Sequence, residues 1–374
     1  MERLLPRWRE FSVEPFQMGG KITLQEIAVA ARVSVATASR ALNGTGQVSP
    51  DVAKRVLAAA AKLRVKPQYA GKNQTICFLL ANRSMLHPFH AHVLMGSQEF
   101  AIEHQNHVLF YPFHYRANVP LDEIELPLLV DRRGSVDGFI VGGMNSKNLL
   151  ELLTRIGVPF AVLGNNVWGP WDPSQYDVVW MDDLTGAYEM TQYLQELGHK
   201  QIWFLGSRRF PTSRIHKGYT RAMKEAGLAP HAMESDSEDE REAGYVAAKS
   251  LFAKRAKITA IFAYNDAVAH GAIEAARACG LKIPEDITVA GFGNRPEAAA
   301  LTPALTTVWA YPDQVGRRLS ELLLSRIANP GGPPQQVVLP TRLIERSSCA
   351  RAATSETIAR KLERFNVSAE SFSS

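Results

Sequence analysis

Short, continuous apolar segments alternate with amphipathic segments of helical length from Thr75 onward. Examples of the expected strands are Thr75–Ala81, Phe160–Leu163 and Ile258–Ala263, none of which shows the polar alternation of a half-exposed strand. Continuous apolar strands are typical of parallel sheets covered by helices on both faces. Because roughly 250 residues of this pattern exceed what one core holds, they predict an α/β body of two similar lobes. A ligand is expected between the lobes, outside the carboxyl ends of the strands.

Composition places the chain in a broad class. Its 374 residues are 46% hydrophobic and 21% charged, as in a soluble globular protein of two or three domains. The sequence has neither the roughly 20-residue apolar run of a membrane span nor a signal-peptide pattern, so we expect a cytoplasmic protein. The three distant cysteines, Cys77, Cys279 and Cys349, suit isolated thiols better than disulfides or a metal cluster.

Positive charge is concentrated at the amino-terminal end. Residues 1–72 hold 12 Lys and Arg against 5 Asp and Glu, a net charge of +7, whereas the remainder has a net charge of −2. A basic head on a near-neutral body is typical of a module that binds phosphate groups. The alternative, a solvated basic tail, is disfavoured because this segment is also patterned to fold.

That pattern is one of three short helices. Thr23–Glu26 forms a capping box, and apolar residues recur on one helical face over the next turns. Ser34 is an expected N-cap for a second helix that ends at Asn43-Gly44, and Ser49-Pro50-Asp51 opens a third. Three helices with a tight turn between the first two predict a helix-turn-helix unit.

The expected second helix is slim. Residues 36–39 and Ala41 are small, and Arg40 is its one long donor. A helix that enters the major groove needs such a shape, and arginine suits bidentate contact with guanine. From these residues alone, a three-helix bundle with Arg40 in a surface ion pair remains an equal alternative.

The resemblance to a known family is close in this head. The run Ile22–Ala28 and the string Val33–Asn43, of the form Val-Ser-x-x-Thr-x-Ser-Arg-x-Leu-Asn, resemble the head of the lactose-repressor (LacI/GalR) family. Val48–Asp51, followed by Arg55-Val56, is similar as well.

The resemblance implies roles for individual residues. Val35 and Ala36 would occupy the main base-reading positions, with Arg40 as a further base contact. The remaining implied DNA-binding residues would mostly hold phosphates or brace the turn, and these are Thr23, Leu24, Ser34, Thr37, Ser39 and Asn43. The implied partners are a near-palindromic double-stranded operator, a second copy of the chain and a small-molecule effector.

The resemblance extends over the body, from about Thr75 to about Cys349. Val136–Ile140, Leu197–Ile202 and Ile283–Ile287 are among the similar stretches. Family members fold this region like periplasmic sugar-binding proteins and dimerise through it. By that analogy the chain crosses between lobes near Gly164, Ala310 and Asn329. The first lobe would then comprise about 75–164 and 310–329, and the second about 165–309 and 330–349.

The effector site departs from the family pattern. Family members usually place acids where this chain has Gly164 and Gly293, and an arginine where it has Ile215. We therefore expect weak affinity for simple hexoses, because buried acceptors for hydroxyl groups are missing. The candidate effector-binding residues are Phe89, His90, Asn165, Arg214, Asn265, Trp309 and Tyr311.

The sequence also supports predictions for four further segments. Residues 1–20 are expected to be an extension, untranslated or disordered, with Met18 as a plausible start, ahead of a helix-turn-helix domain at 21–66. The linker 67–74 is shorter than the family's hinge helix and lacks its leucine, which leaves Tyr69 as its only large apolar group. Residues 350–374 are expected to be a frayed tail, and the acidic segment Ser235–Glu242 a solvated loop.

Other functions fit less well. The sequence contains no nucleophile or phosphate-loop motif, so we expect neither an enzyme nor a cofactor. His87, His90 and His92 are close together, but their spacing belongs to a helix start in the family pattern, and no metal site is expected. A stand-alone solute-binding protein would have an export signal and no basic head. The prediction is therefore a dimeric transcription regulator, with a repressor favoured over an activator or dual regulator.

Overall fold

The computed structural model describes residues 24–43, 48–62, 74–83, 87–117, 119–127, 135–208, 213–254, 256–353 and 361–362. The chain divides into two compact units, Met1–Tyr69 and Ala70–Ser374. The predicted extension at 1–20, the Thr23 cap, the Gly44 helix end and the hinge linker up to residue 73 lie outside the described residues.

Three helices form the first unit: α1 (Leu24–Ala31), α2 (Val35–Asn43) and α3 (Pro50–Lys62). Arg32, with a φ of 55°, lies at the turn after α1, and its amide donates to the Val29 carbonyl at 3.1 Å. The predicted three-helix head with a tight first turn is thus confirmed. Its core consists of small and medium apolar side chains, namely Ile27, Ala28, Ala31, Ala38, Val56 and Ala59.

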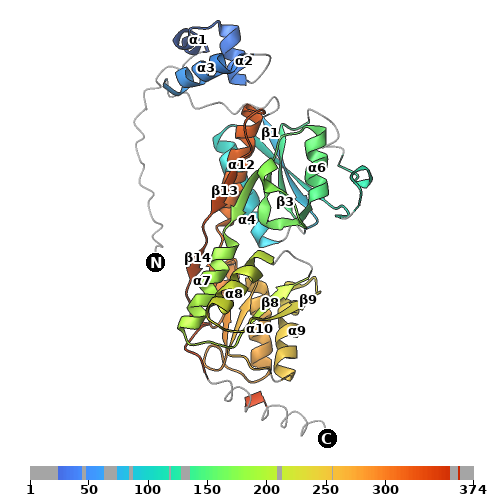
Figure 1. Ribbon diagram of the computed structural model, residues 1–374, viewed down its shortest axis with the longest axis vertical. Coiled ribbons are helices and arrows are strands. Elements are labelled where there is room, and N and C mark those ends of the chain that lie inside the picture. Colours follow the sequence, from blue (N-terminus) through green and yellow to red (C-terminus); the bar gives the residue numbers. More distant parts are fainter. Residues whose placement is uncertain are drawn as a thin grey trace, which may run out of the picture. The chain divides into compact units, whose positions relative to one another are not determined.

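The first lobe of the second unit contains a six-stranded parallel sheet in the order β13-β7-β5-β3-β1-β2. Figure 1 shows α6 (Lys147–Ile156) on one side of this sheet and α4 (Pro88–Glu103) and α12 (Pro312–Ala328) on the other. The strands are β1 (Thr75–Ala81), β2 (His107–Phe113), β3 (Gly138–Gly143), β5 (Phe160–Leu163), β7 (Asp177–Met181) and β13 (Gln336–Leu339).

The second lobe contains a four-stranded parallel sheet in the order β11-β10-β8-β9. Its helices pack in two pairs, α7 (Asp183–Glu196) with α8 (Ser213–Glu225), and α9 (Glu240–Ala253) with α10 (Asp266–Ala278). The strands are β8 (Ile202–Ser207), β9 (His231–Ser235), β10 (Ala260–Ala263) and β11 (Thr288–Ala290). The predicted α/β body of two lobes with buried parallel sheets is confirmed.

Short elements connect these layers. They are the 3-10 turns η1 (Leu121–Glu123), η2 (Gly164–Asn166) and η3 (Pro173–Gln175), the strands β4 (Asn145–Ser146), β6 (Val167–Trp168), β12 (Thr307–Trp309) and β14 (Arg342–Ile344), and the helix α11 (Pro296–Ala300).

Two of the three predicted crossovers lie elsewhere. The chain does not leave the first lobe near Gly164, because β7 follows and pairs with β5; it leaves after Met181. It does not cross at Asn329 either, because β13 pairs with β7 and completes the first sheet. Only the crossing near Ala310, between β12 and α12, matches the prediction. The predicted lobe limits were wrong because strand pairing between distant segments decides them.

The predicted frayed tail is also wrong in part. The Lys361 ammonium group contacts both carboxylate oxygens of Asp286, at 2.7 and 2.8 Å, and Leu362 is only 4% exposed. These two residues thus pack on the second lobe.

The three cysteines are isolated thiols, as predicted: Cys77 and Cys279 are buried and Cys349 is half-buried. Burial raises the pKa of the Cys77 thiol to about 12, so it is an inert core residue. Within the described ranges, no helix combines the length and the apolar character needed to span a membrane.

Candidate functional site

Ser34 caps the second helix of the head. The Thr37 amide donates to the Ser34 hydroxyl at 3.1 Å, and the two side-chain hydroxyls lie 2.8 Å apart. This bond satisfies one of the amides that a helix start leaves without a partner, and such a cap contributes about 1 kcal/mol. The predicted cap is confirmed, and it sets the start of α2.

One face of α2 is open to solvent. Val35 is 42% exposed, Ala36 and Arg40 are also exposed, and Ala38 on the opposite face is fully buried in the head core. The Arg40 Nε donates to the Ala36 carbonyl at 3.2 Å, and Arg40 has no ion pair with another described residue. The helix therefore presents a slim surface with one long cationic donor.

The other residues of the head that were predicted to bind DNA differ in their exposure to solvent. Ser34 is exposed, whereas Thr37 and Ser39 are half-buried. Leu24 is half-buried and packs against the head core. Thr23 and the side chain of Asn43 lie outside the described part of the chain.

A cavity of about 550 Å³ lies between the two lobes of the second unit. Its lining follows the carboxyl ends of strands in both sheets, such as Asn165 after β5 and Asn265 after β10, and the first turns of α4 and α12. This is where the sequence predicted a ligand. Apolar and aromatic side chains make up much of the wall, among them Phe89, Met181, Ile215, Tyr264, Phe292 and Trp309.

Five of the seven candidate effector residues line this cavity: Phe89, His90, Asn165, Asn265 and Trp309. Arg214 and Tyr311 do not. The Arg214 guanidinium forms an ion pair with Asp183, which lines the cavity, and lies 5.0 Å from the Trp180 ring centroid. Tyr311 stacks on Trp309, with ring centroids 4.0 Å apart.

Two side-chain amides that line the cavity form hydrogen bonds to the backbone of the protein. Asn165 donates to the Met181 carbonyl at 2.9 Å and accepts from the Met181 amide at 2.8 Å. Asn265 caps α10 by accepting from the Val268 amide at 2.9 Å. Asn165 therefore braces the exit of the chain from the first lobe.

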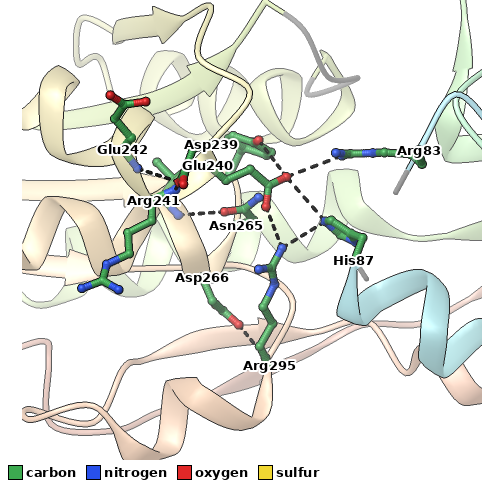
Figure 2. Close-up of polar contacts among 11 residues, drawn as sticks. Arg83, His87, Asp239, Glu240, Arg241, Glu242, Asn265, Asp266 and Arg295 are labelled. Carbon is green, nitrogen blue, oxygen red and sulfur yellow. Dashed lines mark hydrogen bonds and ion pairs between the residues drawn. The ribbon is translucent and has the colours of Figure 1, made fainter. Parts of the chain in front are cut away.

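A charged cluster that the sequence analysis missed closes one side of the cavity (Figure 2). Glu240, at the start of α9, forms ion pairs with Arg295 at 2.7 Å and with Arg83 at 3.5 Å. The Arg295 Nη2 also lies 3.0 Å from Nε2 of His87. Arg83 and His87 belong to the first lobe, and Glu240 and Arg295 to the second, so the cluster bridges the lobes.

The pKa of Glu240 reflects this cluster. Burial alone would raise the pKa, but the hydrogen bond with His87 and the charges of Arg295 and Arg83 hold it well below its usual range. Burial lowers the pKa of His87, and more strongly that of His90. Glu240 is therefore an anion held by two guanidinium groups.

The expected solvated loop at Ser235–Glu242 was thus wrong at both ends, because Ser235 ends β9 and residues from Glu240 onward belong to α9. Asp239 caps α9 by accepting from the amides of Arg241 and Glu242, at 2.9 and 3.0 Å, and helix α9 begins at Glu240. The Glu240 side chain is only 9% exposed. An acid one residue after a cap is the one signal in the sequence that could have indicated it.

The structure also explains the two glycines where family members carry acids. A Cβ atom on Gly164 would lie 2.7 Å from the Trp180 ring, and Gly293 has a φ of +123°, which side chains rarely adopt. Neither position accepts a carboxylate. The acids that line the cavity, Asp183, Glu240 and Asp313, come instead from other elements.

Both units of the chain resemble known protein families. Residues 23–68 match the family of bacterial regulatory proteins called the lacI family, and residues 191–349 match the periplasmic binding protein-like domain. A solved complex of the transcriptional regulator CelR with cellobiose is similar, with 26% identity and a TM-score of 0.64, over 88% of this chain and 100% of that one.

Two curated relatives are similar over nearly their whole length. The transcriptional repressor PurR of Edwardsiella ictaluri is 30% identical over 342 residues, which is 88% of this chain and 97% of the relative. The transcriptional regulator DegA of Bacillus subtilis is 30% identical over 341 residues, 88% and 98% of the two chains. With its helix-turn-helix head and its two-lobed body, the chain belongs to the lacI family of DNA-binding transcription regulators.

Proposed function

We propose that this chain acts in the cytoplasm as a homodimeric repressor of transcription, controlled by a small molecule that binds between the lobes. The exposed face of α2, capped by Ser34 and carrying Arg40, is the observation on which DNA recognition rests. The cavity between the lobes supports the effector site. The similar regulator CelR has cellobiose bound in its solved complex.

The exposed face of α2 carries the residues that recognise the base sequence. Val35, Ala36 and Arg40 read base edges in the major groove. Ser34, Thr37 and Ser39 contact phosphates or brace the turn. The same role for Thr23 and Asn43 rests on the family resemblance alone. Leu24 contributes by packing α1 on the head core rather than through an exposed side chain.

Exposed apolar side chains favour a dimer through the first lobe. Ile102 and Met95 of α4 are 69% and 52% exposed. Leu109 and Tyr111, in the edge strand β2, are also exposed. An apolar surface at a sheet edge is a natural interface between copies of one chain. A two-fold dimer reads two half-sites, which is why the operator is near-palindromic.

A genome-wide map of the sites that the full chain binds, combined with transcript levels of neighbouring genes after its deletion, tests this proposal. If the chain is a repressor, the bound sites should be near-palindromic and lie at promoters. Transcript levels of the neighbouring genes should then rise in the deletion strain. Falling transcripts would identify an activator instead, and the absence of any shared site would contradict the proposal.

Arg40→Ala should relax sequence preference at one base pair in each half-site. Loss of a bidentate contact to a base costs on the order of 1–3 kcal/mol, so affinity for the operator falls while affinity for random DNA changes little. Competition binding against operators mutated at single positions measures this. Equal losses on operator and random DNA would show that Arg40 contacts phosphate only.

The operator should be bent less than those of typical family members. The linker 67–74 is short, lacks the leucine of the family's hinge helix and contains Gly71, which weakens any helix by about 1 kcal/mol relative to alanine. Without an apolar wedge the central base step stays stacked. A circular-permutation assay on bound operator measures the bend. A strong central kink that disappears in Tyr69→Ala would show that Tyr69 replaces the leucine.

A further inference from the structure

Three polar contacts of the charged cluster join the two lobes directly. Glu240 of the second lobe lies 3.5 Å from the Arg83 guanidinium group and 3.5 Å from Nε2 of His87, both in the first lobe. The Arg295 Nη2, in the second lobe, lies 3.0 Å from the same His87 nitrogen (Figure 2). The four side chains are between 9% and 17% exposed, so salt and water screen these contacts only weakly. We refer to Arg83, His87, Glu240 and Arg295 as the interlobe cluster.

Ordered backbone holds both halves of the interlobe cluster in place. In the first lobe, His87 is the residue that precedes the first turn of α4. In the second lobe, Glu240 follows the Asp239 cap of α9, and the Arg295 amide donates to the buried carboxylate of Asp266 at 2.6 Å. Because these backbone positions are fixed within each lobe, bringing the lobes together orders little more than the side chains themselves.

The covalent connections between the lobes lie side by side and form a hinge. The chain crosses after β7, after β12 and after β13. The Asp182 amide donates to the Leu339 carbonyl at 2.8 Å, and the Thr341 hydroxyl donates to the Asp182 carbonyl at 3.1 Å. Trp309 pairs with Arg342 in the small sheet of β12 and β14. These contacts tie the three crossings to one another.

The interlobe cluster lies away from this hinge. Its four residues belong to none of the crossings. Figure 1 shows β13 and β14, which flank the third crossing, on one side of the body and α9, which begins with Glu240, on the other. A rotation at the hinge that opens the cavity would therefore separate Glu240 from Arg83 and His87.

Such a separation is resisted but remains reversible. Glu240 would lose its first-lobe partners and keep Arg295, which lies in its own lobe. The separated charged groups would regain water, and hydration offsets much of the attraction between buried ions. The closed and open bodies should thus differ by a free energy small enough for a small molecule to reverse.

We propose that the interlobe cluster is a latch that keeps the lobes closed over the cavity when no small molecule is bound. The proposal rests on the proposed function, in which this cavity holds the effector, and it adds a means of regulation. The effector acts on an equilibrium that Arg83, His87 and Glu240 already bias toward the closed body. The latch therefore sets how much differential affinity an effector needs to change the body.

The distance between the lobes tests the proposal in the full chain, without effector or operator. Spin labels on Arg155→Cys, exposed on α6 of the first lobe, and on Val246→Cys, 55% exposed on α9 of the second, report this distance by pulsed electron paramagnetic resonance. Dilution with unlabelled chain confines the signal to labels within one copy, and chain without the two introduced cysteines gives the background.

The otherwise unchanged chain should give one short distance. Arg83→Gln removes a contact between the lobes and leaves the pair of Glu240 with Arg295 in the second lobe intact. It should add a longer distance, with the ratio of open to closed chains raised about tenfold or more. His87→Gln cuts the other first-lobe contact and should shift the ratio in the same direction. Arg83→Lys keeps the charge and should restore most of the closed population.

Arg241→Gln is the matched control, because Arg241 also lies on α9 but pairs with Glu274 in the same lobe. It should leave the single short distance unchanged. A longer distance in the otherwise unchanged chain, or none in both Arg83→Gln and His87→Gln, would overturn the latch, and so would equal opening in Arg241→Gln. Thermal unfolding of each preparation identifies any variant that has lost its fold. Operator binding is measured separately, so latched lobes in a chain that binds no operator would contradict the regulator and not the latch.

Discussion

Removal of residues 1–72 should abolish operator binding. These residues hold a net charge of +7 and the whole of the described α2 face, whereas the rest of the chain has a net charge of −2. Without the cationic head, both the phosphate contacts and the base contacts are lost, so affinity should fall by at least about 10³-fold. An electrophoretic mobility shift assay on an identified operator measures this.

The remaining chain should stay folded, because the second unit has its own sheets and cores and forms a separate compact unit. Circular dichroism and thermal unfolding of residues 73–374 provide the control, with Arg241→Gln in the full chain as a charge change outside the head. Operator binding that survives the truncation would mean that the body supplies the DNA surface.

Replacing Glu240 with alanine should destabilise the second unit strongly. The substitution leaves Arg83 and Arg295 facing each other in a site where their side chains are only 15% and 17% exposed. Breaking a buried ion pair by removing one partner costs about 3–5 kcal/mol. Denaturant unfolding of the wild-type and variant chains should show the loss as a lower midpoint.

Glu242→Ala is the matched control, since Glu242 is an exposed acid in the same helical turn, and a change of about 0.5 kcal/mol or less is expected. Because folding lowers the pKa of Glu240, its stabilisation is present above the ordinary value of 4.5 and is lost as the pH falls through the lowered value. The difference between wild type and Glu240→Ala should therefore persist at neutral pH and narrow in acid. Equal midpoints for Glu240→Ala and Glu242→Ala would contradict this account of the cluster.

Local signals in the sequence predicted the elements of this protein. The Ser34 cap, the apolar face of α1 and the continuous strand Thr75–Ala81 each depend on residues within one or two turns or on one strand, and the structure has all three where the pattern indicated. The family resemblance placed the cavity and five of its lining residues, because the ends of parallel strands meet at one edge of each sheet.

Contacts between distant segments decided the limits of the two lobes and the burial of Glu240. Nothing local to Val178 shows that β7 pairs with β5 and β13, so the lobe limits could not be read from the chain. Nor does the acidic run around Glu240 distinguish the one side chain that turns inward from its solvated neighbours. Glu240 is buried because the Asp239 cap starts α9 where Arg83 and Arg295 approach from two lobes, and only the tertiary structure brings those charges together.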